Sequence, residues 1–339
     1  MGFLIYILPI LIAIGLGVAQ FDAGKRQIAH LVELGLGPGH EVRFGDFRGS
    51  PFDLRLDDMT IRDAEGVWFD LDDFRFEWTP SALLRGRLVI NELSLASLAL
   101  ERLPESEDEA PREKTERRFE IPGLPRPLRG LVIERMAIGE LALGERIAGE
   151  RTVFALDGQL EARDPRQEFA LALRLTRQDE PTARLVATAE LKPPEEPGDG
   201  PPILTVDLEA EETGGLLAAV AGAPQGADLT VSLKGTAPVT DWRGRLSGRV
   251  GGVGRVDADL GLRAAADLSA FAASADGVLD LEPRLLPDGA APLIEPEARF
   301  ALRLRRPEEG DRLIVERLAV TTQAATAEAT ARLALAEQT

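Results

Sequence analysis

The chain contains no cysteine and little histidine or aromatic residue. Of its 339 residues, none is Cys, two are His, and 5% are Phe, Trp or Tyr. Without cysteine there can be no disulfide bridge, thiolate metal site, cysteine nucleophile or lipid attachment at an N-terminal cysteine. The two histidines, His30 and His40, lack a metal-ligand spacing. We therefore expect no metal site and no cofactor.

Motifs of enzyme chemistry are also missing. The glycine-rich segments at 35–39 and 251–254 do not have the phosphate-binding spacing between a strand and a helix. No Gly-x-Ser-x-Gly elbow occurs, and the aspartates between 57 and 73 lack the spacing of a calcium loop. These absences predict a protein that is not an enzyme.

The charge balance is strongly acidic, with 39 Lys and Arg against 57 Asp and Glu, a net charge of −18. A polyanion repels nucleic acid and anionic membrane surfaces, so we expect neither to be a partner of the chain as a whole. Hydrophobic residues make up 44% of the chain, enough to remove a large apolar surface from water. With so few aromatics, that surface is mostly aliphatic.

The N-terminus carries the one long apolar run, FLIYILPILIAIGLGVA at 3–19. As a helix it would span about 26 Å at ~1.5 Å per residue, slightly less than a bilayer core. The small residues at 17–19 would suit a signal peptidase, but the run exceeds the usual signal core of about 7–15 residues. We expect an uncleaved anchor at 1–22, followed by a short helix and a glycine-rich break at 23–40, although no Lys or Arg precedes the run.

From residue 41 the dominant pattern is alternation of apolar and polar residues. Side chains of a strand point to opposite faces with a period of two, so each such run predicts a strand with one apolar and one polar face. The parity of the apolar residues changes at two-residue polar gaps such as 72–73, and a turn or β-bulge at each gap would restore a common apolar side. We count sixteen to twenty strands.

Charged and proline-rich stretches divide this β-rich chain. We expect a first β segment at 41–103, a solvated loop at 104–130, and further strands over 131–339 with no closing cap. A helical turn is predicted at 79–86, and an interior helix at 213–224. The predicted fold is therefore mainly β and predominantly antiparallel, with a few short helices.

The alternation alone leaves two architectures open. The apolar face could be an ordinary core, made by stacked sheets or a closed barrel, or it could line a curved groove that holds lipid chains. The residues that would line this face are Phe52, Leu54, Leu56, Val67, Phe69, Leu71, Phe74, Phe76, Leu88, Ile90, Leu93, Leu95, Leu98, Leu100, Phe154, Leu156, Phe169, Leu171, Leu173 and Leu175.

Residues 52–103 resemble the N-terminal region of the TamB and AsmA-like family, and more broadly the repeating-β-groove lipid-transfer proteins. The similar elements are the turn Asp63-Ala64-Glu65-Gly66, a strand ending in Trp78-Thr79-Pro80, then Leu83-Leu84-Arg85-Gly86 and Leu88-Val89-Ile90. An N-terminal anchor before acidic β-rich sequence also fits the family layout.

The resemblance implies an elongated, curved β-groove, anchored in the inner membrane with its bulk in the periplasm. Its lining would carry phospholipid toward the outer membrane, in outer-membrane biogenesis. The family's C-terminal region, which engages an outer-membrane barrel partner similar to TamA, has no counterpart in this sequence. The alternative function is an assembly factor for outer-membrane β-barrel proteins or autotransporters, acting by strand addition.

Overall fold

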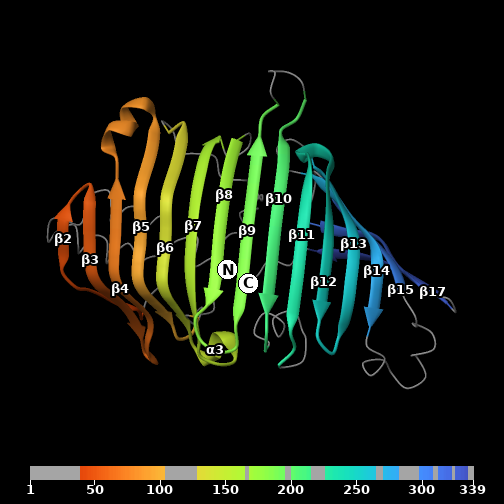
Figure 1. Cartoon of the computed structure of the whole chain (residues 1–339), viewed down its shortest axis with the longest axis horizontal. Coiled ribbons are helices and arrows are strands. Elements are labelled where there is room, and N and C mark those ends of the chain that lie inside the picture. The colour runs from red at the N-terminus through yellow and green to blue at the C-terminus, as the bar shows by residue number, and fades with distance from the viewer. Residues whose placement is uncertain are drawn as a thin grey trace. The chain divides into compact units, whose positions relative to one another are not determined.

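A computed structural model describes residues 39–103, 128–164, 168–194, 200–214, 226–264, 270–281, 298–307, 312–322 and 325–334. These residues are mainly β, with open, mostly antiparallel sheet and very few helices (Figure 1). The predicted fold class is confirmed at that level. The anchor expected at 3–19, the helix after it and residues 215–224 of the helix expected at 213–224 lie outside the described residues.

The chain divides into two compact units. The N-terminal unit includes described residues 39–103, 128–162 and 173–180, and the C-terminal unit includes 163–172 and those from 181 onward. The strands are β1 Glu41–Phe44, β2 Phe47–Ser50, β3 Asp53–Asp63, β4 Gly66–Trp78, β5 Arg87–Leu100, β6 Gly130–Leu143, β7 Thr152–Asp164, β8 Glu168–Arg177, β9 Ala183–Lys192, β10 Ile203–Glu212, β11 Leu229–Pro238, β12 Trp242–Val250, β13 Gly254–Ala264, β14 Phe271–Leu281, β15 Ala298–Arg306, β16 Arg312–Thr321 and β17 Thr326–Ala334.

In the N-terminal unit, β1 and β2 both pair with β3, and β3, β4 and β5 follow as antiparallel neighbours. β6 then pairs with β5 in parallel, and β7 returns antiparallel to β6. Parallel neighbours need a long crossover because the chain must return to the end of the sheet where it started. The interval from Leu100 to Gly130 provides that length.

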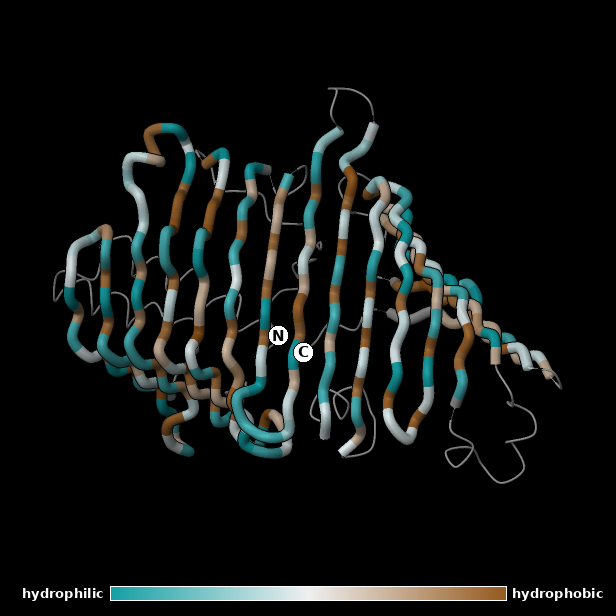
Figure 2. The backbone as a smooth tube through the Cα atoms, viewed as in Figure 1, coloured by the Kyte–Doolittle hydropathy of each residue, from teal (hydrophilic) through white to brown (hydrophobic). Residues whose placement is uncertain are grey.

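The C-terminal unit is a simple meander. β9 to β17 pair in chain order, each antiparallel to the next. The registers are regular except in β16, where irregularities against β15 and β17 fall between Val315 and Leu318. Alternating hydrophobic and hydrophilic positions are visible along these strands in Figure 2.

Three short helical segments occur among the residues placed by the structure: η2 Pro80–Arg85, α3 Glu145–Ala148 and η3 Val239–Asp241. The helical turn predicted at 79–86 is therefore confirmed as η2. Within the described ranges, no helix has both the length and the hydrophobicity that crossing a membrane requires.

The predicted parity changes occur inside strands. Asp73 adopts φ +48° in the middle of β4, so that Leu71 and Phe74, on either side of the polar gap, are both fully buried. In β5, Ile90, Leu93, Leu95 and Leu98 are all buried despite two changes of parity. A chain irregularity at each polar gap thus keeps large apolar side chains on one side, as the sequence predicted.

The irregularities line up between neighbouring strands. In β6, Gly139 lies against Ala96 of β5, and a Cβ at position 139 would approach the carbonyl oxygen of Ala96 to 2.7 Å. This close approach explains why glycine occupies the position. Because β5 and β6 change parity together, their apolar residues stay paired, as in Leu93 with Met136.

Candidate lipid-binding surface

The N-terminal unit has a continuous apolar face. Residues that pair directly across a sheet lie on the same face, and the register pairs Leu54 with Phe76 and Leu56 with Phe74. The face continues into β5, β6 and β7 through pairs such as Ile90 with Ile133. The buried cluster consists of Leu54, Leu56, Met59, Ile61, Trp68, Phe69, Leu71, Phe74, Phe76, Trp78, Leu88, Ile90, Leu93, Leu95, Leu98 and Ile133.

This N-terminal face is closed to solvent. The side chains of Leu56, Phe69, Leu71, Phe74 and Phe76 have 0% exposure. Val42, Phe44 and other partly buried residues of the same unit pack around them. The face therefore has the character of a packed hydrophobic core.

The C-terminal unit has an equally continuous apolar face, which we call the C-terminal apolar face. One row across the sheet runs through Leu208, Leu233, Leu246, Ala258 and Phe300, connected by register pairs and by Gly277 of β14. Other large residues of this face are Leu185, Leu191, Leu204, Val206, Val231, Val250, Val256, Leu260, Leu262, Leu279, Leu302 and Leu304.

The large side chains of the C-terminal apolar face are mostly partly exposed. Leu208, Leu233, Leu246 and Phe300 all keep some contact with solvent, whereas the buried members of this face are four alanines together with Leu191, Glu212, Leu229 and Trp242. In the described part of the unit the one helical segment is the three-residue η3, which joins β11 to β12. Neighbours within a sheet hide only the flanks of a side chain, so partial exposure is what an uncovered sheet face gives.

Trp242 is the one large buried residue at the start of β12, with 7% exposure. Its ring lies over Gly235 and Gly244, where an added Cβ would approach ring atoms to 2.3 and 2.4 Å. Its Nε1 donates a hydrogen bond to the carbonyl oxygen of Leu204 at 3.1 Å, which places the indole across β11. The two glycines therefore make room for an aromatic ring lying along the C-terminal apolar face.

The structure places the predicted lining residues in three environments. Phe52 and Val67 are exposed, at 48% and 47%. The partly exposed residues are Leu100, Leu156, Phe169, Leu171, Leu173 and Leu175. Those that are buried are Leu54, Leu56, Phe69, Leu71, Phe74, Phe76, Leu88, Ile90, Leu93, Leu95, Leu98 and Phe154.

The start of β4 departs from the predicted alternation. Trp68, expected opposite Val67 and Phe69, is fully buried together with Phe69 while Val67 is exposed. A register shift between Ile61 and Arg62 accounts for the change, because Phe69 pairs with Ile61 but Val67 pairs with Arg62. Trp68 is therefore an extra residue of β4 with no partner position on β3, as in a β-bulge, and the strict alternation of faces fails there.

Sequence reasoning missed Met59, Ile61 and Ile133 on the N-terminal face, and it nominated no lining residue beyond position 175. Met59 and Ile61 follow Leu54 and Leu56 after the gap Asp57-Asp58, the kind of gap that was recognised at 72–73. The same rule applied to β3 would have found them. The C-terminal strands carried the same period-two signal as those that were nominated.

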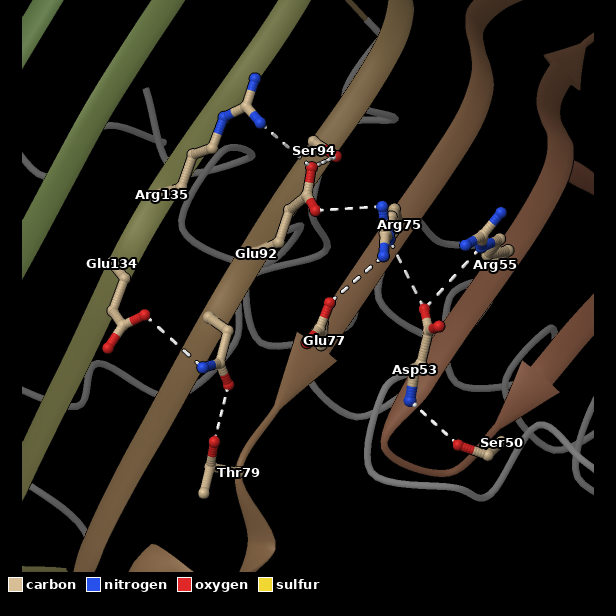
Figure 3. Close-up of polar contacts among 11 residues, drawn as sticks. Ser50, Asp53, Arg55, Arg75, Glu77, Thr79, Glu92, Ser94, Glu134 and Arg135 are labelled. Carbon is tan, nitrogen blue, oxygen red and sulfur yellow. Dashed lines mark hydrogen bonds and ion pairs between the residues drawn. The ribbon is translucent and has the colours of Figure 1, made fainter.

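The polar face of the N-terminal unit carries a connected network of charges and hydrogen bonds (Figure 3). Arg75 of β4 lies at its centre, 3.5 Å from Asp53, 3.2 Å from Glu77 and 3.3 Å from Glu92. Glu92 also lies 3.6 Å from Arg135 of β6. The network thus connects β3 to β6 on the side away from the apolar face, and a network fixes register better than isolated surface pairs.

A second cluster surrounds Arg177, whose side chain is 1% exposed. Its Nη2 lies 2.9 Å from Glu150 and its Nε lies 3.0 Å from Asp179. Burial alone would lower the pKa of Arg177, but the hydrogen bonds that its guanidinium donates to Asp179 and Glu150 outweigh burial and raise the pKa. Burial likewise acts to raise the pKa of Asp179, yet hydrogen bonds from Arg177 and the Val153 N–H hold that pKa below its usual value.

The polar face of the C-terminal unit is lined by exposed cross-strand pairs. Lys234 lies 2.6 Å from Glu209, and it holds the pKa of that carboxyl below its usual value. Arg303 lies 2.8 Å from Asp276 on the neighbouring strand. Opposite charges across strands favour this register, although partly exposed aliphatic residues such as Val186 and Val278 also lie on this face.

The two faces together can bind an apolar chain but offer it no specific polar contact. Aliphatic side chains donate no hydrogen bond, so a hydrocarbon would be held by burial alone, at ~0.8 kcal/mol per CH₂. The chain matches no family model, no curated protein and no solved structure. The resemblance to the TamB and AsmA-like family therefore remains a prediction.

Proposed function

We propose that this protein is a phospholipid conduit, anchored in the inner membrane by residues 3–19, that carries acyl chains along an apolar β-face in the periplasm toward the outer membrane. The C-terminal apolar face is the observation that carries the proposal. It crosses nine paired strands without a charged residue in its central row, and its large side chains are partly exposed.

The dimensions of this face suit a lipid chain. Nine strands at about 4.8 Å spacing give a surface on the order of 40 Å across, and strands of about ten residues give about 30 Å along each strand. Burying apolar area is favourable at roughly 25 cal/mol per Å², and no single residue dominates such binding. A hydrocarbon chain can therefore move from one set of neighbours to the next with little change in free energy.

The N-terminal unit has a different part in this proposal. Its apolar face is already closed to solvent, so we assign it the role of a stable base and not of the lipid path. The lining residues predicted on β3, β4 and β5 then contribute to folding stability. The proposed lipid path is the C-terminal apolar face, over the strands from β9 to β17.

Photo-crosslinking at matched positions tests this proposal. A photoreactive amino acid is placed at Leu233, Leu260 or Leu302 of the C-terminal apolar face, and in control variants at the neighbouring positions Lys234, Asp259 or Arg303 of the polar face. We expect phospholipid adducts by mass spectrometry at the first three positions and none at the controls. Adducts to protein instead of lipid would favour the assembly-factor alternative, and equal lipid labelling on both faces would contradict the proposal.

A further inference from the structure

The turn between β4 and β5 exposes two adjacent leucines at one end of the N-terminal unit. Leu84 is 91% exposed and Leu83 is 40% exposed. The turn is the coiled ribbon that joins the upper ends of β4 and β5 in Figure 1, and Figure 2 shows a hydrophobic stretch in it. Two leucines side by side in water are unfavourable unless something apolar covers them.

The outward position of both leucines follows from the local backbone. η2 is a 3-10 helix with three residues per turn, so three successive side chains point in three directions. Ala82 takes the inward direction and is buried, which leaves Leu83 and Leu84 outside. The turn is closed by Gly86, which has φ +71° and donates its N–H to the carbonyl oxygen of Leu83 at 2.8 Å.

A third apolar side chain lies at the same end of the sheet. Phe52 precedes β3, and its carbonyl oxygen accepts a hydrogen bond from the N–H of Trp78, the last residue of β4. The ring of Phe52 packs edge-on against Trp78 at 5.8 Å between centroids and still leaves 48% of the residue exposed. Phe52 is therefore held in place by the sheet while much of its surface faces water.

Two arginines flank this turn. Arg85 is the last residue of η2, and Arg129 donates its backbone N–H to the carbonyl oxygen of Gly86 at 2.6 Å. Both residues are exposed, and no carboxylate in the described ranges lies within ion-pair distance of either guanidinium. Most other exposed arginines of this unit have such a partner, so Arg85 and Arg129 are two uncompensated cations beside the turn in a chain of net charge −18, while the nearby carboxylates of Asp53 and Glu77 are paired with Arg75.

We propose that Phe52, Leu83 and Leu84, together with Arg85 and Arg129, form a membrane-contact tip that docks this end of the N-terminal unit on an anionic bilayer surface. Leucine and phenylalanine enter the boundary between headgroups and acyl chains, and arginine beside them contacts lipid phosphates. Three side chains are far too few for a stable protein interface, which needs about 800 Å² per partner, whereas a bilayer requires no complementary shape. The acidic remainder of the chain is repelled by the same surface, and this repulsion favours contact through the tip.

The proposal does not rest on lipid transport. A chain that never carries lipid could still contact the bilayer through this tip, and a conduit could lack the contact. The measurement below uses a local probe and no transfer assay, so the two ideas fail separately.

The absence of cysteine permits a single local probe in the full chain. Leu84→Cys is labelled with an environment-sensitive fluorophore, and Leu103→Cys, an equally large residue that is 63% exposed beyond the opposite end of β5, is the matched control. The labelled proteins are added to vesicles of phosphatidylethanolamine and phosphatidylglycerol. We expect the emission at position 84 to shift to shorter wavelength and to become protected from iodide, with neither change at position 103.

A charge variant then sharpens the test. Adding Arg85→Gln and Arg129→Gln to the labelled Leu84→Cys protein is expected to reduce the shift on anionic vesicles and to remove its dependence on salt. Unchanged emission at position 84, or the same change at 84 and 103, would overturn the proposal. Circular dichroism of each variant shows that the sheet is intact.

Discussion

The strands of both units alternate apolar and polar residues, but the apolar face is buried in the N-terminal unit and partly exposed in the C-terminal unit. In the N-terminal unit the apolar face includes Phe69, Phe74 and Phe76 at 0% exposure. In the C-terminal unit, Leu233, Leu246 and Phe300 occupy an equally continuous face and stay partly exposed. Both faces are backed by a charged outer surface with cross-strand ion pairs.

A period-two pattern therefore specifies which face of the sheet a side chain lies on, but it does not specify whether that face is buried. The two faces also differ in composition. The N-terminal face contains large aromatic residues, which bury much area per residue, whereas the C-terminal face is mostly Leu, Val and Ala. We infer that the first face is built for stability and the second for reversible contact with hydrocarbon.

The largest expected difference between the units is in stability. Phe74→Ala should destabilise the N-terminal unit by about 3–5 kcal/mol, because it leaves a cavity in a closed core. Phe300→Ala, its matched control on the partly exposed face, should cost the C-terminal unit about 1–2 kcal/mol, since less area is lost from burial. Urea unfolding measures both free-energy losses, with the fluorescence of Trp68 and Trp78 reporting on the N-terminal unit and that of Trp242 on the C-terminal unit. Equal losses of stability in the two variants would contradict the difference between a buried and a partly exposed face.

Lipid binding should be sensitive to substitutions on the C-terminal apolar face, in contrast to stability, which is more sensitive to substitutions in the N-terminal unit. Leu260→Glu places a charge on the C-terminal apolar face and should reduce phospholipid adducts at Leu233 at least about tenfold, because even 1.4 kcal/mol changes an equilibrium constant tenfold. Ser247→Glu on the polar face is the control and should leave the adducts unchanged. Quantitative mass spectrometry of both variants decides, and equal adducts in Leu260→Glu and the parent would refute the lipid path.

The buried arginine cluster gives the N-terminal unit a predictable pH dependence. The pKa of Asp179 is lowered in the folded state, so its contribution is present above the unfolded pKa of about 3.9 and is lost as pH falls through the lower folded value. Asp179→Asn should cost about 1–2 kcal/mol at pH 7, allowing for the partial exposure of the carboxylate. Urea unfolding between pH 7 and pH 2 should show this cost shrinking below about pH 4, and a cost that does not vary with pH would show that the carboxylate charge is not its source.

The smallest effect is expected at Asp70, whose pKa is raised by burial and by the nearby Asp72 and Asp58. A raised carboxyl pKa means that the charged form is disfavoured in the folded state, so the penalty exists above the folded pKa and disappears as pH falls below the unfolded one. Asp70→Asn should therefore stabilise the unit slightly at pH 7, by no more than about 0.5 kcal/mol. Thermal melts at pH 7 and pH 3 test this, and a variant less stable than the parent at pH 7 would contradict it.

Much of the strand architecture was predictable from the alternation. The described residues form seventeen strands, within the sixteen to twenty that the alternation predicted. Polar gaps correctly predicted the irregularity at Asp73, because a gap of two polar residues can keep a common apolar face only if the chain departs from regular geometry.

Three features could not be predicted in this way. The parallel pairing of β5 with β6 joins strands that are separated by the interval from Leu100 to Gly130, and the alternation within a strand does not indicate which strands pair. The burial of Trp68 depends on a register shift set by its partner strand. The closure of the N-terminal face depends on packing over the sheet, and neither periodicity nor composition along one strand measures that.

Quenching of tryptophan by phospholipids with brominated acyl chains tests whether acyl chains lie on the C-terminal apolar face. One variant keeps Trp242, which lies along the C-terminal apolar face, and replaces Trp68 and Trp78 by Phe; the other keeps Trp68, which is closed to solvent in the N-terminal unit, and replaces the other two. Because the claim places acyl chains on the C-terminal face alone, brominated lipid should quench Trp242 strongly and leave Trp68 unchanged. Unquenched Trp242, or equal quenching of both, would contradict the account.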